Sequence, residues 1–255
     1  NLNNMKNIRS IFTLLIVITA AFLWGCGDDS TTGGNNTGGT LPNISMQVGS
    51  IYIYNIDSLG TNGSINKTSL KTSNTFLAQG TYFGQSGAFQ ILSQTKDTIS
   101  NITLSTDTFY VRYDGGKFYQ YGVLQLISPT IPASWDLVAD FNVSQGTSYT
   151  IATGVPINIG TITGATANIT GSVAEYTSFT TAGWGNVVIN CYRAEIVADI
   201  LFSGFSIGKV YVDYYVGDAN PTSNPSGMVR VKLRPVNLSV YSQSGVDQYF
   251  LRKTP

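Results

Sequence analysis

The sequence has no histidine among its 255 residues. Histidine is the commonest general base and metal ligand near neutral pH, so its absence excludes Ser-His-Asp and Cys-His catalysis and histidine-containing zinc sites. Charged residues are also scarce, at 11% of the chain, against roughly a quarter in an average protein. The formal net charge is zero, so we do not expect nucleic acid as a partner.

Cysteine is nearly absent as well, with only Cys26 and Cys191 present. If Cys26 is modified, Cys191 has no partner within the chain, and no disulfide can form. The neighbours Asn190 and Tyr192 bring no positive charge that would lower the pKa of the Cys191 thiol. We therefore expect Cys191 to be a free and unreactive thiol.

The chain begins with a segment that is typical of an export signal. Lys6 and Arg9 precede an uncharged run, Ile11 to Trp24, of 14 residues. This run is too short to cross roughly 30 Å of hydrocarbon but is typical of a secretory signal peptide. We expect residues 1–25 to be the signal peptide, with residues 1–4 an over-extended reading frame before Met5.

The run ends in Leu23-Trp24-Gly25-Cys26, which resembles the lipobox of bacterial lipoproteins. The resemblance implies that Leu23 and Gly25 are read by the processing machinery and that Cys26 becomes the lipidated N-terminus. Trp24 departs from the family pattern, which usually has Ala, Ser or Thr there. An ordinary signal peptide cut nearby remains the alternative.

Residues 26–42 contain the tract STTGGNNTGGT, whose Gly, Ser, Thr and Asn residues predict a flexible tether. Asp28 and Asp29 resemble a signal for export to the outer surface in several Gram-negative lineages, or they simply keep the tether soluble. We therefore expect a cell-envelope lipoprotein of the outer membrane, either periplasmic or surface-exposed.

Residues 43–255 are expected to form one all-β domain, because the pattern has period two far more often than period 3.6. A hairpin is predicted around Asp114-Gly115-Gly116, joining Thr106–Tyr113 to Lys117–Ile127. Apolar and polar residues alternate over some 16 residues before Ser203, so we expect Ile196 and Ile200 to face the core, with Glu195 and Asp199 on a polar face. Arg193 shares that polar face, where we expect cross-strand ion pairs. Ile65 to Ser73 is polar, and we expect a weak or edge strand there.

A strand of that length favours a single large curved antiparallel sheet, a half-barrel or open barrel, with a β-sandwich as the alternative. The chain loosely resembles the LolA/LolB/LppX-like lipoproteins, which have a curved β half-barrel. The resemblance is carried by Gly49-Ser50-x-Tyr52-x-Tyr54, by Thr181-Ala182-Gly183 before Cys191-Tyr192, and by Gly227-Met228-Val229. It implies lipid binding, although no helices are predicted to cover the concave face.

Aromatic residues are the main candidate ligand contacts. Trp135, Trp184, Tyr192 and Tyr214 could stack on a ligand, although aromatic residues are also ordinary strand formers. We expect Asp136 and Asp140 to be solvent-facing acids beside a core Trp135. Arg230, Lys232 and Arg234 share one face of a strand, and we expect them to form a solvated face or to guard an edge, which Pro235 favours. Contact with phosphate head groups is the alternative.

No residues are assigned to catalysis, a metal or a cofactor. Oxygen ligands gather at Asp213, Asp218, Asn220 and Asn224, but turn chemistry explains them without calcium. We expect a non-enzymatic binding or structural module that takes a lipid, glycan or protein ligand and is anchored to the membrane by its lipid. A histidine-free carbohydrate-active enzyme that uses carboxylates is the alternative.

Overall fold

The computed structural model describes residues 41–128, 130–159, 162–181, 187–219, 225–238 and 241–254. The signal peptide with Leu23 and Gly25, the lipidation candidate Cys26, the tether and Trp184 lie outside the described residues.

Strands make up most of this part of the chain, and one short helix interrupts them. The elements are β1 (Ile51–Leu59), β2 (Ile65–Tyr82), β3 (Gln85–Asp97), β4 (Ile102–Asp114), β5 (Lys117–Tyr121), α2 (Val123–Ile127), β6 (Trp135–Asp140), β7 (Ser148–Ile159), β8 (Ile162–Thr181), β9 (Val187–Phe202), β10 (Phe205–Gly217), β11 (Gly227–Leu233), β12 (Val236–Leu238), β13 (Tyr241–Gln243) and β14 (Gly245–Thr254). Among the described residues, no helix is long and apolar enough to cross a membrane.

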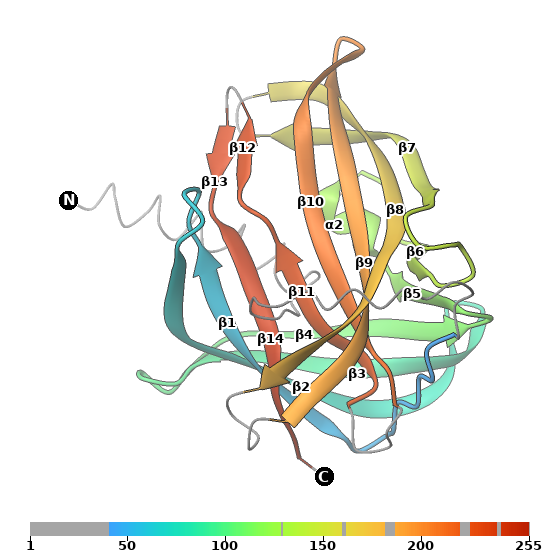
Figure 1. Ribbon diagram of the computed structural model, residues 1–255, viewed down its shortest axis with the longest axis vertical. Helices are drawn as coiled ribbons and strands as arrows, with labels where there is room; N and C mark the ends of the chain where they lie inside the picture. The colour runs from blue at the N-terminus through green and yellow to red at the C-terminus, as the bar shows by residue number, and fades with distance from the viewer. Residues whose placement is uncertain are drawn as a thin grey trace.

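Twelve of the strands form one antiparallel sheet in the order β6-β5-β4-β3-β2-β1-β14-β11-β10-β9-β8-β7, and β12 and β13 form a separate pair. The sheet curls until its edges approach each other, so that β6 lies against β7, β8 and β9 (Figure 1). The predicted large curved antiparallel sheet is confirmed, and its shape is a nearly closed barrel.

Tyr149 of β7 fills the seam between the two edges. Its hydroxyl donates a hydrogen bond to the Val138 carbonyl oxygen of β6, at 3.1 Å. The ring crosses Gly171 of β8, where an added Cβ would lie 2.4 Å from it. A side chain at position 171 would therefore push the ring out of the seam.

Side chains fill the barrel interior. Tyr52, Tyr54, Phe76 and Phe250 are almost fully buried, and their rings contact one another edge-on, with centroids 5.0 Å apart for Tyr52 and Phe76. Alternation holds along β9, where Ile196 and Ile200 point inward while Glu195 and Asp199 face outward. This register confirms the predicted faces of the long strand.

Two predicted edges are wrong. The polar segment from Ile65 belongs to β2, which is 18 residues long and lies between β1 and β3. The strand that carries Arg230 is β11, which lies between β14 and β10 because the chain leaves the sheet after Leu233 and re-enters it as β14. Pro235 marks that exit rather than an edge.

The region after β5 also differs from expectation. The strand ends at Tyr121, and residues 123–127 form α2 instead of continuing it. Asp136 is buried because its carboxylate accepts hydrogen bonds from the Leu124 backbone N–H at 2.8 Å and from the Ser134 hydroxyl at 2.6 Å. Asp140 is also buried, and its carboxylate accepts a hydrogen bond from the Asn142 backbone N–H at 3.0 Å. The prediction that both acids face solvent is therefore wrong.

Residues 41–50 form a strap across one end of the barrel. At the β4–β5 side, the Tyr113 hydroxyl donates to the Pro42 carbonyl oxygen at 3.0 Å. At the β10–β11 side, the Asn43 backbone N–H donates to Asp218 at 3.2 Å, and the Ala219 N–H donates back to the Asn43 carbonyl oxygen at 2.7 Å. The strap therefore fixes the point at which the chain enters the domain.

Candidate functional site

The four candidate aromatic residues do not come together. Trp135 lies on the outer face of β6, next to the inward-facing Asp136, so the expected core position of Trp135 is wrong. Tyr214 is fully buried inside the barrel, and Tyr192 is buried among the rings of Phe141 and Tyr176. Trp184 lies outside the described residues. Of the four candidates, Trp135 is the one that the structure places on the outside of the barrel.

Trp135 belongs to a chain of ring contacts on the outer face of the barrel, which we call the aromatic strip. The strip consists of Tyr82, Tyr110, Phe83, Tyr121 and Trp135. Its successive ring centroids are 4.9, 4.9, 3.8 and 5.5 Å apart in that order. The tip of the β2–β3 hairpin supplies Tyr82 and Phe83, and β4, β5 and β6 supply one ring each. Rings from distant parts of the sequence thus form one surface.

Phe83 is the most exposed member of the strip, with 52% of its surface accessible. It occupies the first central position of the two-residue turn between Tyr82 and Gln85, with φ of 48°, and is followed by Gly84 with φ of 77°. Positive φ at both positions defines a type I′ turn, which favours Asn-Gly or Gly-Gly. A bulky residue there is a genuine conformational outlier.

Two other hairpins have the same turn geometry and show the usual choice of residue. The β4–β5 turn uses Gly115 and Gly116, and the β9–β10 turn uses Ser203 and Gly204, all with positive φ. Phe83 therefore pays a conformational cost that a small residue would avoid. Its ring lies parallel to Tyr121, at an interplanar angle of 4°, which offsets part of this cost.

Polar groups border the strip. The Gln90 amide lies 3.4 Å from the Tyr110 hydroxyl. The Arg112 guanidinium lies 4.7 Å from the centre of the Tyr119 ring and is paired with Asp114 at 2.8 Å. Arg112 thus already has a carboxylate and a ring as partners.

The opposite half of the outer face is charged, and we call its ionised residues the ionic belt. The belt crosses β2, β1, β14, β11, β10, β9 and β8 and contains Asp57, Lys67, Glu175, Arg193, Glu195, Asp213, Arg230, Lys232, Arg234 and Asp247. Its five carboxylates and five cations balance. Arg193 reaches Glu175 at 2.9 Å, Asp213 at 3.1 Å and Glu195 at 3.6 Å, which confirms the expected ion pairing around Arg193.

Arg230 and Asp247 form the most deeply buried pair of the belt, each 3% or less exposed. The guanidinium donates two hydrogen bonds to the carboxylate, at 3.2 and 3.0 Å, and it lies 4.9 Å from the Tyr215 ring and 6.0 Å from the Phe179 ring. Burial raises the pKa of Asp247 to about 7, against the opposing attraction of Arg230. The solvated face expected for Arg230 is wrong, because β8 brings Phe179 over it.

The carboxylate pairs needed by a glycosidase can be sought among these residues. Asp57 is opposite Asp247, and Glu195 is opposite Asp213, in neighbouring strands. All four carboxylates are bound to cations: Lys67 binds Asp57, Arg230 binds Asp247, and Arg234 binds both Glu195 and Asp213. This arrangement cross-links strands, and neither of these two pairs is free of cations.

The described residues contain no cluster of three or more side chains suited to a metal ion. Asp213 faces arginines and Asp218 holds the strap, while Asn220 and Asn224 lie outside the described residues. Cys191 is free and buried, and burial raises the pKa of its thiol well above the usual value.

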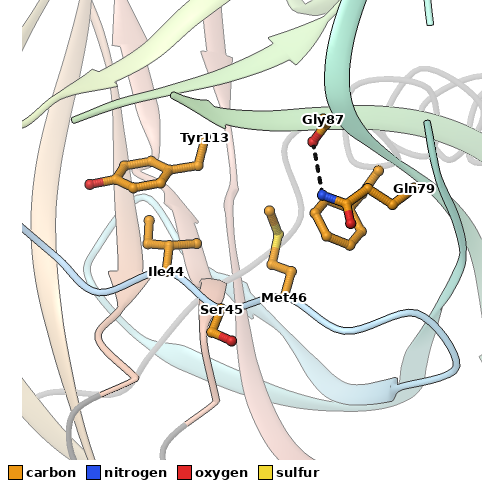
Figure 2. Close-up of a pocket in the computed structure, with 7 residues that line it drawn as sticks. Ile44, Ser45, Met46, Gln79, Gly87 and Tyr113 are labelled. Atoms are coloured by element: carbon orange, nitrogen blue, oxygen red, sulfur yellow. Dashed lines mark hydrogen bonds between the residues drawn. The ribbon is translucent and has the colours of Figure 1, made fainter. Parts of the chain in front are cut away.

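A small pocket of about 270 Å³ lies beneath the strap. Ile44, Ser45 and Met46 line it from the strap, and Gln79, Gly87, Phe89 and Tyr113 line it from the barrel wall (Figure 2). The Gln79 amide is turned to the Gly87 carbonyl oxygen at 3.5 Å. The pocket is a gap between strap and wall, without a charged side chain in its lining.

Sequence reasoning singled out Trp135 but missed Phe83, the most exposed ring of the strip. The available signal was Phe83-Gly84 between two strand patterns, where a turn normally takes a small or polar residue. A comparison with protein-family models and with curated proteins finds no match to this sequence. The class that the structure itself defines is a nearly closed antiparallel barrel with an aromatic strip on one half of its outer face and an ionic belt on the other.

Proposed function

We propose that this protein is a lipid-anchored, non-enzymatic component of the bacterial cell envelope that binds its ligand through the aromatic strip. The anchor is Cys26, at the end of the Leu23-Trp24-Gly25-Cys26 segment. The strap receives the chain from this anchor beside Tyr113 of β4. The barrel then acts as a rigid support for the strip.

The observation that carries the proposal is the placement of Phe83. Strained backbone geometry at an exposed position points to function when the surrounding structure over-determines it. The neighbours of Phe83 in the strip are Tyr and Trp residues, which are enriched at the energetic centres of binding surfaces. The stacking of Phe83 on Tyr121 offsets only part of the conformational cost of this turn, so a small residue would serve the fold about as well. A contact outside the chain gives the phenyl ring a further reason to be there.

Two observations favour surface binding over the alternatives. A lipid carrier needs interior space, whereas the barrel interior around Tyr54 and Phe250 is packed with side chains. A carboxylate enzyme needs acids that can exchange protons with a substrate, whereas Asp57, Asp213 and Asp247 are bound to cations. These points support a binding module over a carrier or a hydrolase.

The experiment uses the mature chain with Cys26→Ser, so that the lipid does not mask binding by the domain. Its sedimentation with purified envelopes of the producing bacterium is compared for three versions: no further change, Phe83→Asn and Phe205→Asn. Phe205 is 76% exposed on the β9–β10 hairpin and is the matched control for loss of an exposed phenyl ring. We expect Phe83→Asn to reduce binding and Phe205→Asn to leave it unchanged; equal binding by all three versions contradicts the proposal.

A further inference from the structure

The aromatic strip differs from the rest of the outer face in carrying no ionised group. Its five members are four tyrosine or phenylalanine rings and one indole. Arg112, on the same strand as Tyr110, is held by Asp114 and by the Tyr119 ring. A ligand for this surface therefore needs no net charge, and a strongly charged one gains little from it.

The strip combines apolar ring faces with polar edges. Tyr82, Tyr110 and Tyr121 carry phenol hydroxyls, and the Gln90 amide reaches the Tyr110 hydroxyl. A pyranose ring has the complementary chemistry, because its C–H face is apolar while its rim carries hydroxyl groups. Aromatic side chains suit such a partner since one end is apolar and the other can hydrogen-bond.

The rings form one continuous series of contacts across several strands. They run from the β2–β3 hairpin tip across β4 and β5 to β6, with each ring contacting the next. The pocket beneath the strap is lined by none of the five rings. A series of ring contacts that spans several strands fits an extended chain of linked rings better than a single small molecule, which usually binds in a cavity.

We infer that the ligand of the aromatic strip is a neutral polysaccharide of the cell envelope, whose successive sugar rings stack along the strip. This inference rests on the proposed function and names the ligand class of the same surface. A protein partner and the lipid bilayer are the competing occupants, and the test separates them.

The test again uses the mature chain with Cys26→Ser. The probe is the neutral polysaccharide fraction released from purified envelopes, and binding is measured by titration calorimetry. The same fraction after periodate oxidation, which cleaves sugar rings between adjacent hydroxyl groups, is the control probe. Phosphatidylcholine vesicles and protease-treated envelopes test the competing occupants.

We expect the untreated fraction to bind, the oxidised fraction not to bind, and Phe83→Asn to weaken binding at least about tenfold, which corresponds to about 1.4 kcal/mol. Phe205→Asn should bind as the parent does. If Phe83→Asn reduces sedimentation with envelopes but the polysaccharide does not bind, or if protease treatment or plain vesicles account for the binding, the inference is wrong and the proposed function stands. If Phe83→Asn changes no binding to envelopes, both are wrong.

Discussion

The two halves of the barrel's outer face use their side chains in opposite ways. In the ionic belt, charges are matched within the chain, and Arg230 and Asp247 are buried beneath Phe179 and Tyr215. In the aromatic strip, Phe83 is half exposed and stands at a turn that disfavours it. The ionic belt holds the fold together, because its charges pair with each other. The aromatic strip keeps an apolar ring exposed despite its conformational cost and is therefore available to an external partner.

The largest loss of stability is expected at the buried ion pair of the ionic belt. Asp247→Ala leaves the Arg230 guanidinium buried without a counterion, and we expect it to lower the free energy of unfolding by about 3–5 kcal/mol. On the strip side, Asp114→Ala removes a partner from Arg112 at a pair whose acid is 68% exposed, so we expect a loss of at most about 1 kcal/mol. Urea unfolding measures both.

The double variant Arg230→Met with Asp247→Leu is the control for lost charge as opposed to lost volume. It removes both charges together, and we expect it to recover most of the stability lost in Asp247→Ala. A double variant no more stable than the single one contradicts the view that an unpaired buried charge causes the loss.

The second-largest loss of stability is expected at the seam between β6 and β7, where the two halves of the barrel meet. Gly171→Ala places a methyl group against the Tyr149 ring, which lies 2.4 Å from the position of the new atom. We expect a loss of about 1–3 kcal/mol, as for other overpacked sites. Gly154→Ala cannot serve as a control, because Gly154 has φ of 64°. The control is the double variant Gly171→Ala with Tyr149→Ala, in which the clash is absent. It should lose less stability than the two single variants lose in sum.

The pH dependence of stability should also separate the halves. The folded pKa of Asp247 is raised to about 7 from an ordinary value of 3.8. Between about pH 4 and pH 7 the folded state therefore holds a proton that the unfolded state has released, so this group makes stability fall as pH rises through that window and adds no slope above it. Arg230, Lys232, Lys67 and Asp57 face the carboxyl and set this balance.

Unfolding free energies at pH 4.5 and 7.5, measured for the parent and for Arg230→Met with Asp247→Leu, check this sign. From pH 4.5 to pH 7.5, the free energy of unfolding should fall further for the parent than for the double variant, because only the parent carries the Asp247 carboxyl. The other titrating groups are common to both proteins. A larger loss in the double variant means that Arg230, rather than burial, dominates the pKa of Asp247.

Local alternation was sufficient to predict part of this architecture. The faces of β9 followed from the spacing of Ile196 and Ile200, and the β4–β5 hairpin followed from the Asp114-Gly115-Gly116 turn. The order of the strands in the sheet could not be predicted in this way, because β1 pairs with β14 from the far end of the chain. Long-range pairing leaves no local pattern.

The same limit explains the errors around the site. Arg230 looked solvated because its strand alternates between charged and apolar residues, but the ring that covers it, Phe179, belongs to β8. In the sequence, Phe83 is the last residue of a strand pattern that begins at Phe76. Its importance depends on stacking against Tyr121 from another hairpin. Contacts between distant segments therefore decided which residues are structural and which are available for binding.

The smallest expected change in stability provides the most direct test of the central claim, that the strip is kept for binding. Phe83→Asn exchanges a strained phenylalanine for a residue that type I′ turns favour, while the stacking on Tyr121 is lost. These effects oppose each other, and we expect the free energy of unfolding to stay within about 1 kcal/mol of the parent.

The decisive measurement pairs that unfolding free energy with envelope binding for the same Phe83→Asn protein. The account predicts nearly unchanged stability together with binding reduced at least about tenfold. A protein that is destabilised by several kcal/mol yet binds as the parent does would show that Phe83 serves the fold, and the strip could no longer be regarded as the binding surface.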